Sequence, residues 1–241
     1  MTVTEAINHR ISRRKYLATP MSAEQLAKLS GLIEQYSEEE NIRFELVSEC
    51  ESAFDGLSKS YGMFNGVNSC IALIKTGDDP TAVERLGYYG ELLVLHATAM
   101  NLGTCWVAGT FSKKDLPLEI TENEELMCLI TIGNVPEKNS LKEKFFRGVT
   151  HRKSKTAQEM YTADKTPPAW FLAGMEAVVK APSAVNKQPV MFSFKDGEVA
   201  AKVGDLSKTY SALDFGIAKL HFQFGAGGGS WAWGIGGTYT K

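Results

Sequence analysis

The chain has 241 residues, of which 44% are hydrophobic and 22% charged, a composition typical of a globular protein with a sizeable core. Its 26 basic and 28 acidic residues leave a formal charge of −2, so it lacks the basic excess that indicates nucleic-acid binding. The first ten residues hold no apolar signal core, and no apolar run approaches the roughly 18 residues that cross a bilayer. We therefore expect a cytoplasmic protein with neither nucleic acid nor membrane as a partner.

The first half of the chain predicts three helices and three strands. In chain order these are helix 2–11, helix 21–40, strand 43–48, strand 69–75, helix 81–103 and strand 126–133. Ser22 and Gln25 form a capping-box pattern at the start of the second helix, and Leu26, Leu29 and Ile33 lie on its apolar face. Gly103 is the expected C-cap of the third helix.

The second half begins with a polar and basic stretch over residues 136–168, the best candidate for a linker or arm. A helix is predicted over 169–180, a hairpin over 190–203 with Asp-Gly at its turn, and a helix over 213–227 before a glycine-rich tail. The four cysteines have no zinc-ligand spacing, so we expect reduced, buried thiols and no metal site. They are Cys50, Cys70, Cys105 and Cys128.

An internal repeat appears when the last helix and its tail are moved back by 125 positions. Five pairs of identical residues then coincide: Leu220 with Leu95, His221 with His96, Gly228 with Gly103, Trp231 with Trp106, and Gly234 with Gly109. An internal duplication explains this pattern, with a first half over 1–150 and a shorter, degenerate half over 151–241. Two such halves would form a dimer within one chain, about a pseudo-twofold axis.

Several short motifs resemble those of the FMN-dependent nitroreductases. "HRISRRKY" (9–16) resembles the family's Arg-x-Ser-x-Arg signature, and "APSAVNKQPV" (181–190) resembles its Pro-Ser-x-x-Asn-x-Gln-Pro loop. "HATAMNLGTCWVAGTF" (96–111) is similar to the family's core helix followed by its flavin-facing segment, and "RGVTHRKS" (147–154) to its basic arm. The resemblance implies an α+β, nitroreductase-like fold with a central, mostly antiparallel sheet flanked by helices.

The position of the second motif departs from the family pattern. The amide-rich loop usually follows the arginine motif by about 25 residues and comes from the partner subunit, whereas here "QYSEEENIRF" (35–44) occupies that place. The resemblance therefore implies a fused nitroreductase in which both halves complete one FMN site per chain. Such a chain would be either a monomer whose two halves form a pseudo-dimer or a weak homodimer.

The resemblance also assigns roles to particular residues. Arg10 and Arg152 would bind the FMN phosphate, and Arg14 the flavin edge that becomes negative on reduction. The full set of expected cofactor contacts is Arg10, Ile11, Ser12, Arg14, Trp106, Val107, Ala108, Gly109, Arg152, Pro182, Ser183, Ala184, Asn186 and Gln188. No side chain is expected to act as catalytic acid or base. Arg13 and Lys15 are expected to face solvent, and His96 and His221 to be core or interface residues.

The implied activity is a ping-pong reduction in which NADH or NADPH reduces FMN and a small-molecule acceptor then takes the electrons. Nitroaromatics, quinones and activated alkenes are the acceptors that the resemblance implies. Two alternatives stay open: other flavin chemistry on the same fold, such as reductive dehalogenation or oxidative ring chemistry, and non-catalytic FMN binding. The glycine-rich tail follows a helix rather than a strand, which argues against a dinucleotide-binding loop.

Overall fold

The computed structural model describes residues 1–55, 62–137, 154–206 and 208–241. The chain divides into two compact units. The first unit is Met1–Asp79 with Leu93–Val149, and the second is Pro80–Leu92 with Thr150–Lys241. In the described part of the chain, none of the helices combines the length and apolar character needed to cross a bilayer.

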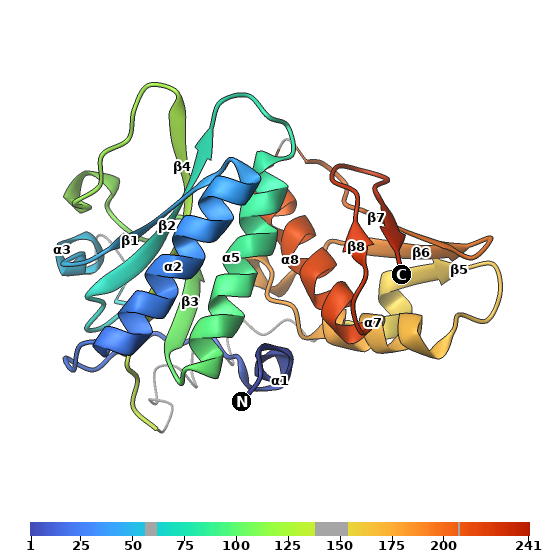
Figure 1. Ribbon diagram of the computed structural model, residues 1–241, viewed down its shortest axis with the longest axis horizontal. Helices are drawn as coiled ribbons and strands as arrows, with labels where there is room; N and C mark the ends of the chain where they lie inside the picture. Colours follow the sequence, from blue (N-terminus) through green and yellow to red (C-terminus); the bar gives the residue numbers. More distant parts are fainter. Residues whose placement is uncertain (56–61, 138–153, 207) are drawn as a thin grey trace. The chain divides into compact units, whose positions relative to one another are not determined.

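The first unit is built on a four-stranded antiparallel sheet in the order β1-β2-β4-β3 (Figure 1). Its strands are β1 (Arg43–Val47), β2 (Ser69–Thr76), β3 (Gly103–Val107) and β4 (Glu124–Gly133). The two central strands are continuous apolar runs, and their residues Ile71, Leu73 and Leu129 are fully buried. The sheet therefore leaves β3 as one of its two edge strands.

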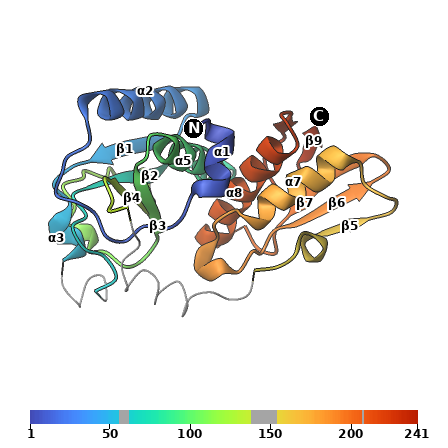
Figure 2. The ribbon, with the colours of Figure 1, turned by 90° about the horizontal axis from the view of Figure 1, so that it is seen from below.

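Helices complete the first unit. They are α1 (Val3–His9), α2 (Ala23–Glu40), the short α3 (Glu51–Phe54), the one-turn η1 (Lys113–Asp115) and the C-terminal part of α5 (Ala82–Ala99). The capping box of Ser22 and Gln25 is confirmed, and α2 covers one face of the sheet with Leu29 and Ile33 buried (Figure 2). The predicted C-cap at Gly103 is wrong, because α5 ends at Ala99 and Gly103 is already the first residue of β3. Asn101 takes the left-handed turn after the helix instead, with φ of 63°.

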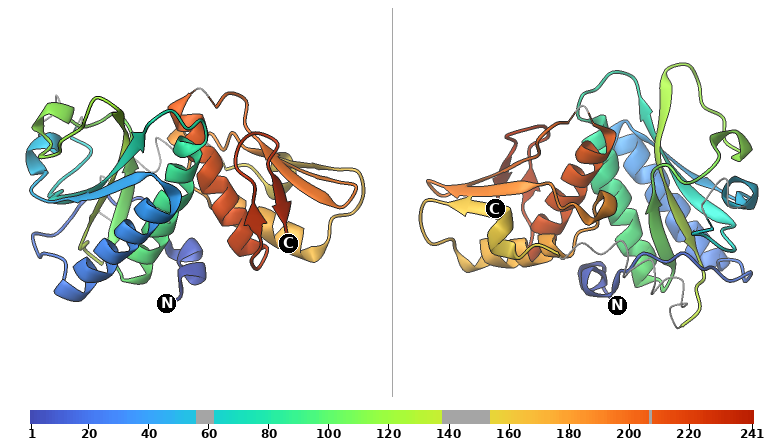
Figure 3. Two further views of the ribbon diagram at one scale, coloured as in Figure 1. Left: turned by 45° about the horizontal axis from the view of Figure 1, so that its top comes forward. Right: turned by 180° about the vertical axis from the view of Figure 1, so that it is seen from behind.

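The second unit contains a five-stranded sheet in the order β5-β6-β7-β9-β8, in which only β5 and β6 pair in parallel. Its strands are β5 (Tyr161–Ala163), β6 (Met191–Lys195), β7 (Glu198–Lys202), β8 (Ser230–Trp231) and β9 (Thr238–Thr240). Figure 3 shows β5, β6 and β7 side by side in yellow and orange. The Asp-Gly turn is confirmed, since Asp196 and Gly197 both have positive φ. The glycine-rich tail, by contrast, forms the two strands β8 and β9.

Two long helices pack against each other in this unit, α7 (Ala169–Val179) and α8 (Thr209–Gly225). Its one-turn helices are η2 (Ala157–Met160) and η3 (Ala184–Asn186). The core beneath them is aromatic: Phe192 stacks on Phe222 at 5.1 Å, and Trp231 meets Phe222 edge-on at 5.4 Å. Further rings of the same cluster are Trp170, Phe171, Phe194 and Tyr239.

The N-terminal part of α5 belongs to the second unit and crosses α8 at two glycines. A Cβ atom on Gly216 would lie 1.9 Å from the carbonyl oxygen of Glu84, and one on Gly87 would lie 2.2 Å from that of Leu213. The two helices are thus in backbone contact. Only glycine allows that approach.

Two fully buried polar side-chain pairs join the same helices. Lys219 Nζ donates to Glu84 Oε1 at 2.5 Å, and His221 Nε2 lies 3.0 Å from Glu91 Oε1. The second carboxylate oxygen of Glu84 accepts from the backbone N–H of Gly234, so this pair also holds the glycine-rich tail. His221 bonds through both ring nitrogens, and its expected place in the core is confirmed.

Other expectations concern organisation and the thiols. All four cysteines are buried and unbridged, as the sequence predicts. In both copies of the repeat a helix runs into a strand, α5 into β3 and α8 into β8. The duplication, and with it the division at residue 150 into two halves, stays a prediction.

Candidate functional site

The first group of candidate residues lies along the edge strand of the first sheet. After α1 the chain continues as an extended segment, Arg10–Arg14, which we call the arginine segment. Ser12 forms a parallel bridge with Thr104 of β3, and the N–H of Arg13 donates to the carbonyl of Thr104 at 2.8 Å. The arginine segment is therefore fixed to the outer edge of β3.

Side chains alternate along this segment, as extended backbone requires. Arg13 is 7% exposed, and its Nη2 donates to the carbonyl of Pro136 at 2.7 Å. Arg10, Ser12 and Arg14, which alternate with Arg13, are half-buried. The prediction that Arg13 faces solvent is wrong, because the missing side chain of Gly103 leaves it room: a Cβ there would come within 3.0 Å of Arg13. Lys15 is exposed, as expected.

The second group in this unit is the end of β3 and the bend that follows. Val107 is 3% exposed and packs into the core, so its side chain serves the fold. Trp106 and Ala108 are half-buried, and Gly109 is exposed. Backbone N–H and C=O groups point alternately to the two sides of a strand, so those of Trp106 point to the same outer edge of β3 as those of Thr104. The arginine segment and the outward-facing backbone groups of Thr104 and Trp106 thus share one edge of the sheet.

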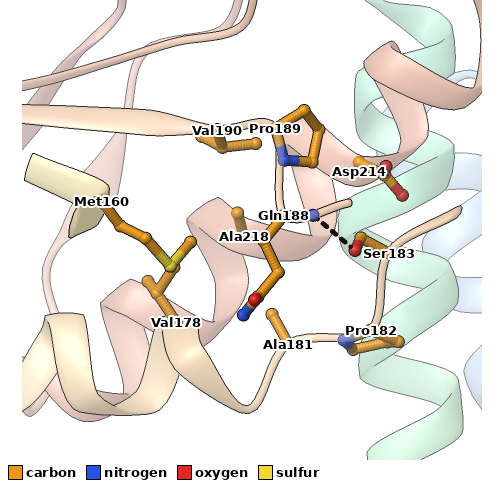
Figure 4. A pocket seen from close by; sticks show the side chains of 10 residues that line it. All are labelled: Met160, Val178, Ala181, Pro182, Ser183, Gln188, Pro189, Val190, Asp214 and Ala218. Carbon is orange, nitrogen blue, oxygen red and sulfur yellow. Dashed lines mark hydrogen bonds between the residues drawn. The ribbon is translucent and has the colours of Figure 1, made fainter. Parts of the chain in front are cut away.

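The third group lies in the second unit, in the loop Pro182–Pro189 between α7 and β6, which we call the amide loop (Figure 4). Ser183 Oγ accepts from the N–H of Gln188 at 2.9 Å and its carbonyl accepts from the N–H of Asn186 at 3.0 Å, which close the loop on itself. Asn186 is half-buried, and its Nδ2 lies 3.4 Å from Ser154 Oγ. Val185, beside it, is 62% exposed.

Gln188 has a role inside the loop that the motif did not reveal. Its side chain is 3% exposed, accepts from the N–H of Lys155 at 2.8 Å and donates to the carbonyl of Val179 at 3.1 Å. This amide therefore anchors the loop to its own unit. Its predicted contact with a flavin stays a prediction.

Asp214 of α8 is the residue that sequence reasoning missed. Its two carboxylate oxygens accept from the N–H of Ala184 at 3.0 and 3.2 Å, and the side chain is 7% exposed. Burial raises the pKa of Asp214 to about 7, against the opposing effects of the Ala184 N–H and the charge of Lys187. The only sequence signal was an acidic residue within the apolar run "LDFGIAKL".

Asp214 also lines a small cavity below the amide loop (Figure 4). The enclosed space is about that of one water molecule, which excludes it as a substrate pocket. Its walls are Met160, Val178, Ala181, Pro182, Ser183, Gln188, Pro189, Val190, Asp214 and Ala218.

The structure thus gathers the candidate residues in two donor sets, one in each unit. Arg10, Ile11, Ser12 and Arg14 belong to the arginine segment, which Ser12 joins to Thr104 on the strand of Trp106 and Val107, and Ala108 and Gly109 form the bend after that strand. Pro182, Ser183, Ala184, Asn186 and Gln188 belong to the amide loop. Arg152 lies outside the described residues. Within those residues, no cluster of histidine, cysteine and carboxylate side chains is suited to hold a metal ion.

A family model described as "Putative TM nitroreductase" matches residues 2–226. No curated protein matches the chain. The crystal structure of a putative nitroreductase from Thermotoga maritima is similar to the whole chain: the TM-score is 0.65 at 21% identity, over 99% of this chain and 92% of that one. The α+β, nitroreductase-like fold is therefore confirmed.

Two further solved structures are similar over a shorter part of the chain. A putative nitroreductase from Desulfovibrio desulfuricans in complex with FMN has a TM-score of 0.44 at 20% identity, over 60% of this chain and 95% of that one. A nitroreductase from Bacteroides fragilis with bound FMN has a TM-score of 0.45 at 15% identity, over 58% of this chain and 92% of that one.

Proposed function

This chain belongs to the nitroreductase family, and we propose that it is an oxidoreductase that binds FMN and passes electrons from NADH or NADPH to a small-molecule acceptor. The observation that carries the proposal is the arginine segment. It holds two half-buried guanidinium groups and a hydroxyl in alternation, bonded to the edge strand of a sheet. The proposed acceptors are nitroaromatics, quinones and activated alkenes.

The chemistry of this donor set fits FMN. A phosphate dianion needs fixed positive charge, and Arg10 offers a guanidinium that can bind two oxygens at once. Arg14 would stabilise negative charge at the polar edge of the ring, and Ser12 would hydrogen-bond that edge. The backbone of Ala108 and Gly109 would orient the ring with donors that do not titrate. Bound FMN supplies hydride and electron transfer, and the residues of the chain bind and orient it.

The amide loop is the second donor set of the proposal. Ser183 and Asn186 offer a hydroxyl and an amide, the groups that match the alternating donors and acceptors of a pyrimidine edge. The loop carries the family motif although it stands far along the chain, at 182–189. We therefore propose that it contributes to the same flavin as the arginine segment of its own chain.

The first experiment measures FMN affinity by fluorescence titration. Arg14→Ala is expected to raise the FMN dissociation constant by about tenfold or more, because it removes a charged hydrogen-bond donor. Lys15→Ala is the matched control, since Lys15 directly follows the arginine segment and its side chain is exposed. Equal affinities for wild type and Arg14→Ala would contradict the assigned role.

Anaerobic titration with NADH and with NADPH tests the activity. The oxidised flavin absorbance is expected to bleach on addition of one of the two, and an acceptor is expected to restore it. A yellow protein that neither nucleotide bleaches would support non-catalytic FMN binding instead.

Mixing two single variants tests whether one chain provides both donor sets. Arg14→Ala and Asn186→Ala are each expected to bind FMN weakly, and their mixture is expected to bind no better. Recovered binding in the mixture would mean that two chains share the site.

A further inference from the structure

The amide loop has an unusual backbone. Val185, Asn186 and Gln188 have φ values of 47°, 52° and 45°, in the left-handed region that residues other than glycine rarely occupy. For Val185 the conformation is especially unfavourable, because its side chain is β-branched. Such residues persist only where the surrounding structure holds them, and they concentrate at functional positions.

Several hydrogen bonds hold this loop, both within it and from neighbouring elements. Ser183 Oγ accepts from the N–H of Gln188, and the Gln188 side chain reaches Val179 and Lys155. These contacts fix the end of the loop. Its start is fixed from α8, where both carboxylate oxygens of Asp214 accept from the N–H of Ala184. Ala184 directly precedes Val185, so this bond acts where the unfavourable backbone begins.

We propose that Asp214 is a positioning residue: its carboxylate ties the amide loop to α8, presents Ser183 and Asn186 to the flavin, and loosens its hold when it takes up a proton. The inference rests on the proposed FMN function. Asp214 itself is held away from solvent and does not touch the cofactor in this scheme. Its effect on binding is exerted through the loop.

Among the described residues, the charges that act on Asp214 can be named. The other residues that line the cavity beside it are uncharged, and Lys187 of the loop is the cation that acts on it. Lys155, the other cation at this loop, donates through Nζ to the carbonyl of Gln188 at 2.8 Å. Because burial raises the pKa of Asp214 to about 7, the group changes its charge near neutral pH. An ionised carboxylate is the stronger acceptor, so the tie to Ala184 tightens as pH rises.

Two variants and one control test this role. Asp214→Asn keeps an acceptor oxygen but cannot ionise, and Asp214→Ala removes the acceptor. Asp164→Asn is the matched control, because Asp164 Oδ2 also accepts the N–H of a residue with positive φ, Asp196, but at the β6–β7 turn. Melting curves of all three variants verify that they are folded.

The first measurement is hydrogen exchange over residues 182–189 without flavin. Exchange is expected to be faster in Asp214→Ala than in wild type at the same pH, and unchanged in Asp164→Asn. Equal exchange in wild type and Asp214→Ala would overturn the proposal.

The second measurement is flavin affinity between pH 6 and 8. FMN and riboflavin are titrated in parallel, because the FMN phosphate itself titrates near pH 6. Affinity of wild type for both is expected to rise several-fold with pH, that of Asp214→Asn to stay constant, and that of Asp214→Ala to be about tenfold weaker at pH 8. A wild-type pH profile in Asp214→Asn would overturn the proposal. If exchange is faster in Asp214→Ala but wild type binds no flavin, the proposed function is refuted, and with it the effect of Asp214 on flavin binding. The hydrogen bond between Asp214 and the amide loop would then still be supported.

Discussion

The crossing of α5 and α8 at Gly87 and Gly216 gives the sharpest stability prediction. In Gly216→Ala the new methyl group would lie 1.9 Å from the carbonyl oxygen of Glu84 and 2.6 Å from the backbone nitrogen of Tyr88. Both neighbours are backbone atoms of a helix, so neither can move aside alone. The helices must separate by more than 1 Å to restore ordinary contact.

Separation of the helices affects more than the methyl group. The bond from Lys219 to Glu84 is short at 2.5 Å and both side chains are at most 1% exposed, so α5 cannot shift without weakening a buried charged pair. Overpacking alone costs about 1–3 kcal/mol, and a disturbed buried pair adds to it. We expect Gly216→Ala to lower the free energy of unfolding by about 3 kcal/mol or more. For a chain of this length that corresponds to a melting temperature roughly 6–12 °C lower.

Gly31→Ala is the matched control. Gly31 lies inside α2, and a Cβ there would have nothing within 4 Å. The substitution should therefore raise stability by about 0.5–1 kcal/mol, the gain from glycine to alanine in a helix. Thermal and urea unfolding followed by circular dichroism measure both variants. A Gly216→Ala protein that melts within 1 °C or so of wild type would refute the close helix contact.

Two further predictions concern buried charge. Asp214 keeps its proton in the folded chain until about pH 7, whereas in the unfolded chain it ionises near its ordinary pKa of 3.8, so the free energy of unfolding should fall as pH rises from about 4 to 7. This difference in pKa corresponds to about 4 kcal/mol in the free energy of unfolding. Urea unfolding across this pH range should show that loss of stability in wild type but not in Asp214→Asn. Lys219→Met leaves Glu84 buried without its cation and should cost about 3–5 kcal/mol in the same assay, whereas Lys219→Met with Glu84→Gln should recover most of it. A double variant no more stable than Lys219→Met would contradict the pairing.

Much of the fold could be predicted because its elements have strong periodicity or strong turn signals. The capping residues of α2 and the Asp-Gly turn of the hairpin are local patterns, so the sequence alone was sufficient to predict where the helix starts and where the hairpin turns. β3 was missed because its five residues follow α5 with only a short turn between them. Gly103 then suggested a helix end, although its lack of a side chain instead makes room for Arg13.

The candidate site was predictable only in part. Alternation separated Arg13 from its neighbours Ser12 and Arg14 but could not indicate which face of the segment is buried. Asp214 escaped notice because its partner, the N–H of Ala184, lies 30 positions away and is a backbone group. Such contacts depend on the packing of α8 beside the amide loop, which no local pattern encodes.

The distribution of tryptophans has an experimental consequence. Trp170, Trp231 and Trp233 belong to the second unit, and Trp106 is the single indole of the first, on the strand beside the arginine segment. Replacement of the other three by phenylalanine would leave Trp106 as a lone fluorophore. Quenching of its emission by added FMN would then report occupancy at the arginine segment directly, without any signal from the unit that carries the amide loop.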